Sequence, residues 1–207
     1  MGQILKFPVQ TAKFGYKRVR KSAKADNPNQ LRLFPEPTGQ ILNFTPALSW
    51  FEQALMLDER EDLHAAELYR KAIAEQDCVA DAYCNLGIIE SRNGNVTRAF
   101  DCFTTSLKHN PRHSEAHFNL GNLYFDANDP RLAQIHFEIA AEMDPSFANV
   151  YFNLALVQAI NDDLAAAVKT LTRYQELVSE ADRRNADELL QNLRRSLAAR
   201  NSRLGAS

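Results

Sequence analysis

The chain has 207 residues, of which 45% are apolar and 24% are charged, and its net charge is -2. This composition excludes a wholly disordered chain and allows one sizeable hydrophobic core. No apolar run reaches the roughly 18 residues that a membrane span needs, so we expect no membrane span, no signal-peptide core and a location in the cytoplasm. The cysteines Cys78, Cys84 and Cys102 lack C-x-x-C spacing, which favours reduced thiols over disulfides or a zinc knuckle.

Residues 1–46 are predicted to form a basic, proline-containing arm and not a folded unit. Residues 1–40 hold eight Lys or Arg against two acidic residues, whereas residues 41–207 hold sixteen against twenty-four. Six basic residues and two aromatic ones between positions 13 and 24 suit phosphate contacts and base stacking, so the arm is a candidate for binding DNA or RNA. A solvated tail, or docking on the acidic part of the same or a neighbouring molecule, remains open, and short apolar runs favour docking. The basic residues are Lys13, Lys17, Arg18, Arg20, Lys21 and Lys24.

Apolar and alanine residues recur at helical spacing from Leu48 almost to the end of the chain. Short gaps with helix breakers interrupt this pattern, for example at Asn93-Gly94-Asn95 and Asn128-Asp129-Pro130. In the second gap, Asp129 is predicted to cap a helix that starts at Pro130, where the missing N–H of proline costs nothing. The pattern therefore predicts helices of about a dozen residues joined by tight turns.

A repeat of 34 residues runs through this helical region. Its small residue lets the first helix of a pair approach the second closely, and an aromatic residue one turn after the repeated alanine fills the seam between pairs. One pair cannot bury its apolar face alone, so several pairs must stack. The repeated positions are Tyr83, His117 and Tyr151; Asn85, Asn119 and Asn153; Leu86, Leu120 and Leu154; Gly87, Gly121 and Ala155; Ala99, Ala133 and Ala167; and Phe103, Phe137 and Leu171.

The pattern resembles the tetratricopeptide repeat, whose signature is W-x2-L-G-x2-Y, then A-x3-F, then P. The clearest copy reads His117-x2-Leu120-Gly121-x2-Tyr124, and Ala133-x3-Phe137 and Pro145 follow it. The resemblance implies an all-α fold, a right-handed α-solenoid of tandem helix-turn-helix repeats with a C-terminal capping helix. The expected units are a divergent leading repeat at 47–79, repeats at 80–113, 114–147 and 148–181, a capping helix at 182–200 and a tail at 201–207.

The resemblance also implies a concave groove, lined by the first helix of each pair, that holds a peptide or a segment of a partner protein. We therefore expect an interaction scaffold or adaptor, and no enzyme. The three repeated asparagines are the most specific feature, because an amide can bond the C=O and N–H of a peptide backbone together; local capping or solvation is the alternative. The candidate groove residues are Asn85, Ile88, Arg92, Phe118, Asn119, Asn122, Asp126, Phe152, Asn153, Leu156 and Ile160.

The charges along the groove bear on the kind of partner. Where the carboxylate clamp of the family carries Lys and Arg, this chain has Asp81, Glu115 and Asn149, so we expect no clamp. The same acidic residues favour a neutral or basic partner segment, although surface charge also serves solubility alone. Self-association through the groove or the ends of the solenoid is a third possibility.

Metal and catalytic sites are not predicted. His109, His113 and His117 are spaced by four, but Pro111 interrupts the helix that would align them, and His117 holds the aromatic position of the repeat. No G-x-G-x-x-G, P-loop, H-E-x-x-H or G-x-S-x-G motif is present. We therefore expect no cofactor.

Overall fold

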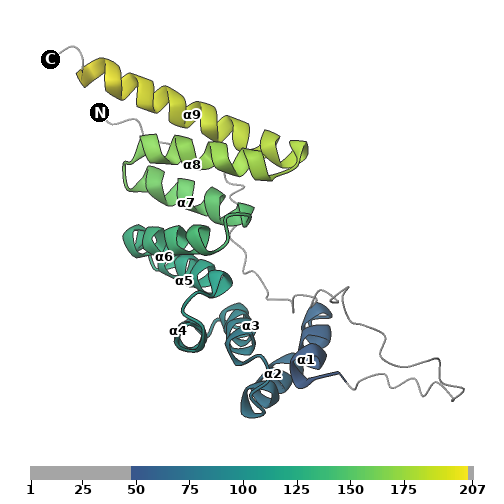
Figure 1. Cartoon of the computed structure of the whole chain (residues 1–207). Helices are drawn as coiled ribbons and strands as arrows, with labels where there is room; N and C mark the ends of the chain where they lie inside the picture. The colour runs from purple at the N-terminus through teal and green to yellow at the C-terminus, as the bar shows by residue number, and fades with distance from the viewer. Residues whose placement is uncertain (1–47, 205–207) are drawn as a thin grey trace, which may run out of the picture.

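The computed structural model describes residues 48–204, which fold into nine α-helices with no strand in that range (Figure 1). The predicted all-α class is confirmed. In the same range no helix is both long enough and apolar enough to cross a bilayer. The helices are α1 (Trp50–Glu59), α2 (Ala65–Ala74), α3 (Val79–Arg92), α4 (Val96–His109), α5 (Ser114–Asp126), α6 (Pro130–Met143), α7 (Ala148–Ile160), α8 (Leu164–Leu177) and α9 (Glu180–Leu204).

The helices stack in chain order as the antiparallel pairs α1/α2, α3/α4, α5/α6 and α7/α8, and α9 lies along the last pair (Figure 1). Each helix packs on the next one in the chain, and the main contact beyond nearest neighbours is between α3 and α5. Packing that runs almost only between neighbours is the arrangement of a repeat solenoid. The predicted α-solenoid is therefore confirmed.

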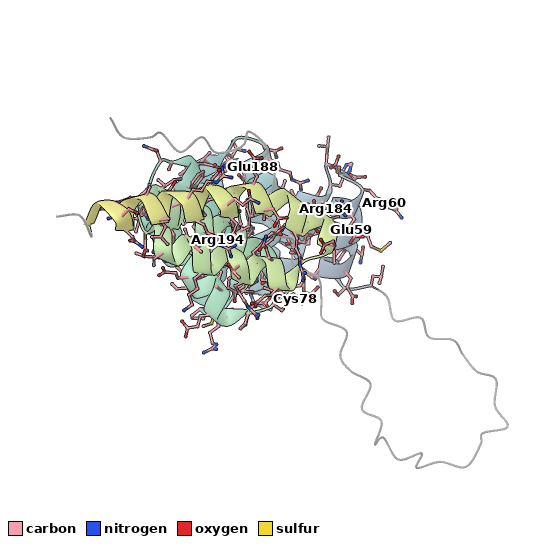
Figure 2. All side chains as sticks on the ribbon, turned by 90° about the horizontal axis from the view of Figure 1, so that it is seen from above. Glu59, Arg60, Cys78, Arg184, Glu188 and Arg194 are labelled. Carbon is pink, nitrogen blue, oxygen red and sulfur yellow. The ribbon has the colours of Figure 1, made fainter. Side chains whose placement is uncertain are left out.

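Helix α9 covers the end of the stack. Its apolar residues Ala186, Leu189, Leu190 and Leu193 are buried in one cluster with residues of α7 and α8. Its opposite side carries exposed charges, which include Arg184, Glu188 and Arg194 (Figure 2). A polar outer face is what the end of a solenoid needs, and the helix is longer than the segment 182–200 expected from the sequence.

Side-chain caps and turns mark the helix boundaries. The Asp129 carboxylate accepts a hydrogen bond from the backbone N–H of Leu132 (3.0 Å), as predicted, and Pro130 is the first residue of α6. Gly94, Asn128 and Asp162, each 34 residues apart, take the left-handed conformation between the two helices of their pairs, with φ of 78°, 60° and 65°. The repeat therefore extends to the backbone of its turns.

The close approach within a pair depends on the small residue of its first helix. A Cβ atom added to Gly121 would lie 2.6 Å from Phe137 Cε1, and one added to Gly87 would lie 2.7 Å from Phe103 Cε1. In α7 the equivalent residue is Ala155, and a leucine, Leu171, stands where the α3/α4 and α5/α6 pairs have phenylalanine. The methyl group that Ala155 adds is therefore accompanied by a leucine side chain, which is smaller than a phenylalanine ring.

Candidate functional site

The three repeated asparagines lie on α3, α5 and α7, and each side chain is 0% exposed. Each amide nitrogen donates a hydrogen bond to a side chain of the preceding unit. The bonds run from Asn85 Nδ2 to Tyr69 OH (3.1 Å), from Asn119 Nδ2 to Cys84 Sγ (3.5 Å) and from Asn153 Nδ2 to Asn122 Oδ1 (2.9 Å). The amides therefore link successive units. Binding of a partner by these asparagines stays a prediction.

Asn153 differs in one respect that bears on binding. Its side-chain oxygen Oδ1 is buried and accepts no hydrogen bond from any residue that the structure describes. A buried carbonyl without a donor costs free energy, so nearly all of them in folded proteins are paired. Because Nδ2 is bonded to Asn122, this acceptor has a fixed orientation.

The apolar groove candidates Ile88, Phe118, Phe152 and Leu156 are buried in the hydrophobic clusters between helices. The ring of Phe118, for example, lies 4.8 Å from the ring of Phe147, centroid to centroid. These side chains are placed to hold neighbouring units together. Their contact with a partner stays a prediction.

The charged groove candidates, Arg92 and Asp126, lie at the ends of different helices. Arg92 Nη2 lies 2.6 Å from Asp58 Oδ1, and the Asp58 side chain on α1 is only 2% exposed. Tyr69 OH also donates to this carboxylate (3.4 Å), so the pair joins α1, α2 and α3. Asp126 at the end of α5 is exposed, although desolvation by nearby atoms raises the pKa of its carboxyl, and Ile160 at the end of α7 is exposed as well.

Sequence reasoning did not identify Asp58 as the partner of Arg92, although one signal was present. The two residues are 34 positions apart, the length of the repeat, so they occupy equivalent heights in adjacent units. Opposite charges at that spacing could have predicted the ion pair.

Two acidic residues gather around the buried His113. The His113 ring accepts the backbone N–H of Ala116 at Nδ1 (3.3 Å), so Nε2 donates to Asp81 Oδ1 (3.0 Å). Glu115 Oε2 lies 3.4 Å from Nδ1. The absence of a carboxylate clamp and the preference of these carboxylates for a neutral or basic segment stay predictions.

A stack of three rings fills the space between α5 and α6. The ring of His136 lies 5.3 Å from that of His117 and 5.3 Å from that of Tyr124, and the two histidine Nδ1 atoms are 3.0 Å apart. Burial lowers the pKa of His117, and burial together with the charge of His117 lowers the pKa of His136 to about 4. The packing role predicted for His117 fits this stack; among residues 48–204 no three potential ligands gather around a metal position.

The six basic residues proposed for nucleic-acid binding, Lys13 to Lys24, lie outside the described residues, as does the whole predicted arm 1–46. Nucleic-acid binding by the arm therefore stays a prediction.

Comparison with known sequences gives two matches to tetratricopeptide repeat profiles, over residues 102–135 and 119–186. Tetratricopeptide repeat protein 8 of Mus musculus is 32% identical over 103 residues, which are 48% of this chain and 20% of that protein. Tetratricopeptide repeat protein 6 of Homo sapiens is 31% identical over 81 residues, 39% of this chain and 16% of that protein. The chain thus matches a fifth or less of the length of these relatives.

Solved structures show the same fold at lower identity. The first TPR of Spaghetti (RPAP3), bound to the HSP90 peptide SRMEEVD, matches with a TM-score of 0.53 and 22% identity over 57% of this chain and 93% of that chain. YrrB, described as a TPR protein with an unusual peptide-binding site, matches with a TM-score of 0.54 and 21% identity over 62% of this chain and 66% of that chain.

Proposed function

The chain belongs to the tetratricopeptide repeat family, and from this premise we propose that it binds an extended segment of another protein along the row of Asn85, Asn119 and Asn153. The observation that carries the proposal is the buried Oδ1 of Asn153, an acceptor with no donor in the described part of the chain. A backbone N–H of a bound peptide is a donor that every peptide offers, whatever its sequence.

The orientation of the amide supports this role. Asn153 Nδ2 is held by Asn122 Oδ1 at 2.9 Å, so the carbonyl does not need to be ordered when a ligand arrives. An acceptor whose geometry is set in advance loses less entropy on binding than a freely rotating one. The hydrogen bonds between units therefore preorganise the asparagine side chains for peptide binding.

The relatives support a peptide as the ligand, and the charges of this chain narrow its type. RPAP3 binds an acidic HSP90 peptide and YrrB has a peptide-binding site, so the fold is able to hold peptides. Here Asp81 and Glu115 lie beside His113, and they occupy the sequence positions at which we expect the clamp of the family to carry cations. Repulsion between carboxylates disfavours an acidic C-terminus, so the proposed partner segment is neutral or basic.

Selection from a displayed library of 12-residue peptides, followed by titration calorimetry with the selected peptides, tests this function. Asn153→Ala should lower the affinity for the selected peptides about 2- to 10-fold, which corresponds to the loss of one hydrogen bond. The far-ultraviolet circular dichroism spectrum should not change. Asn201→Ala changes an exposed asparagine of α9 and serves as the matched control. The peptide SRMEEVD should not bind.

Two results would contradict the proposal. One is an unchanged affinity in Asn153→Ala, which would remove the asparagine row from the binding site. The other is preferential selection of acidic peptides, which would show that the carboxylates near His113 do not shape the choice of partner.

A further inference from the structure

A cavity of about 580 Å³ lies between α7 and α8, separate from the asparagine row. Tyr151, Leu154 and Gln158 of α7 form one wall, and Thr170 and Arg173 of α8 belong to the other. Leu154 and Gln158 are buried, whereas Arg173 is exposed, so the cavity reaches from the interior of the pair to its surface. The volume falls in the range of small-molecule and side-chain pockets, roughly 300–1,000 Å³.

Comparison with the preceding pair shows which residues line the cavity in place of aromatic rings. The residues 34 positions before Tyr151, Gln158 and Thr170 are the three rings of the α5/α6 stack, His117, Tyr124 and His136. Two of the three rings are therefore replaced by smaller, non-aromatic side chains in the α7/α8 pair. In place of these two rings, Gln158 and Thr170 line the cavity.

The cavity also contains an unpaired polar atom. Gln158 is 6% exposed and lines the cavity, and its Oε1 atom accepts no hydrogen bond from any described residue. The side chain stands at the repeat position that Tyr124 holds in the preceding pair. A ligand that enters here gains most if it brings both a flat ring and a hydrogen-bond donor.

We propose that this cavity binds a tyrosine side chain of a partner protein, with the ring beside Tyr151 and the phenol O–H donating to Gln158 Oε1. Such a ring gives the α7/α8 pair the kind of aromatic packing that the α5/α6 pair has, and its hydroxyl donates a hydrogen bond to the buried acceptor. The cationic Arg173 lies 6.0 Å from the ring of Tyr151 and adds a charge that favours aromatic faces at the entrance.

The site is independent of the row of asparagines. Helical residues advance by about 100° each, so Gln158 points roughly 140° away from Asn153 around α7. A partner bound along the asparagines does not reach the cavity through the same face of the helix. The two sites can therefore be tested one at a time, and failure of one does not imply failure of the other.

The first experiment compares p-cresol, the isolated tyrosine side chain, with toluene, which lacks the hydroxyl, on the full chain by ligand-observed NMR titration. We expect p-cresol to bind more tightly. Gln158→Leu keeps a side chain of similar size and removes the acceptor, so it should weaken the binding of p-cresol about 2- to 10-fold and leave the binding of toluene unchanged. Gln191→Leu, the same change at an exposed position of α9, is the control and should have no effect on either.

The second experiment fills the cavity. The double variant Gln158→Tyr with Thr170→His copies the rings of the α5/α6 pair, so p-cresol binding should fall by at least about 10-fold and the thermal midpoint should rise. Blocked tripeptides Gly-Tyr-Gly and Gly-Phe-Gly then test a protein ligand, and the tyrosine peptide should bind more tightly. If the double variant does not fold, the p-cresol and toluene affinities of the wild type and Gln158→Leu still decide whether Gln158 Oε1 binds the hydroxyl.

Three outcomes would overturn the proposal. Equal affinity for p-cresol and toluene would show that Gln158 Oε1 takes no part. Unchanged p-cresol binding in the filled variant would place the ligand elsewhere. Binding of p-cresol without binding of the tyrosine peptide would exclude a partner side chain as the natural ligand.

Discussion

The close approach of Gly121 to Phe137 predicts a large effect of one methyl group. In Gly121→Ala the new Cβ would lie 2.6 Å from Phe137 Cε1 and 2.7 Å from its Cδ1, and the ring is fully buried. Overpacking at such a site costs up to about 3 kcal/mol, and the better helix propensity of alanine returns about 1 kcal/mol. We therefore expect the free energy of unfolding to fall by about 2 kcal/mol.

The α7/α8 pair shows how the clash can be relieved. It carries Ala155 opposite Leu171, and both side chains are fully buried. Phe137→Leu alone leaves a void and should cost about 1–2 kcal/mol. Combined with Gly121→Ala, the methyl group occupies part of that void, so the double variant should lose at least about 1 kcal/mol less than the sum of the single variants.

Guanidinium denaturation followed by circular dichroism gives the four free energies of this cycle, provided that the slope of the transition stays constant. The control combines Gly121→Ala with Phe103→Leu, which removes the equivalent ring of the neighbouring pair and should give no rescue. Additive losses in the Phe137 cycle, or equal rescue by the control, would refute the claim that contact between these two residues sets the spacing of the helices.

Three further predictions test other parts of the chain. Because the pKa of His136 lies at about 4 and not near 6.5, the unfolded chain binds more protons between these values, so stability should fall as pH drops through this window. The loss is about 1–2 kcal/mol after allowance for solvent screening, and denaturation at several pH values should show a flatter dependence in His136→Phe. Arg92→Ala leaves the Asp58 carboxylate buried without its cation and should cost about 2 kcal/mol in chemical denaturation, against less than about 0.5 kcal/mol for the exposed Lys71→Ala. If the arm contacts phosphates, deleting residues 1–30 should abolish salt-dependent binding to DNA or RNA; no binding by either protein would end that hypothesis.

Much of the fold was predictable because its determinants are local and repeated. The spacing of Gly121 and Ala133 specifies where two helices approach, and Asp129 with Pro130 specifies where the second one begins. Each unit packs almost only on the next, so a pattern within 34 residues predicts nearly all contacts between helices.

The environment of individual polar side chains was less predictable. Helical spacing gives the direction of Asn85 on α3, but its hydrogen bond depends on Tyr69, a residue of another unit. Arg92 is an exception, because its partner Asp58 on α1 lies one repeat length before it in the sequence. Pairing across units depends on how far successive pairs rotate against each other, which no single-helix pattern contains.

The α7/α8 pair differs from the preceding pair in two ways. Ala155 and Leu171 compensate each other in size, so this pair of changes leaves packing intact. Gln158 stands where the signature has tyrosine, lines a cavity, and carries a buried acceptor that lacks a donor among the described residues. A change of that kind costs stability, and local rules are broken at such cost mainly where a ligand or partner supplies what is missing. The α7/α8 pair is therefore the unit in which a binding function of this solenoid should be sought first.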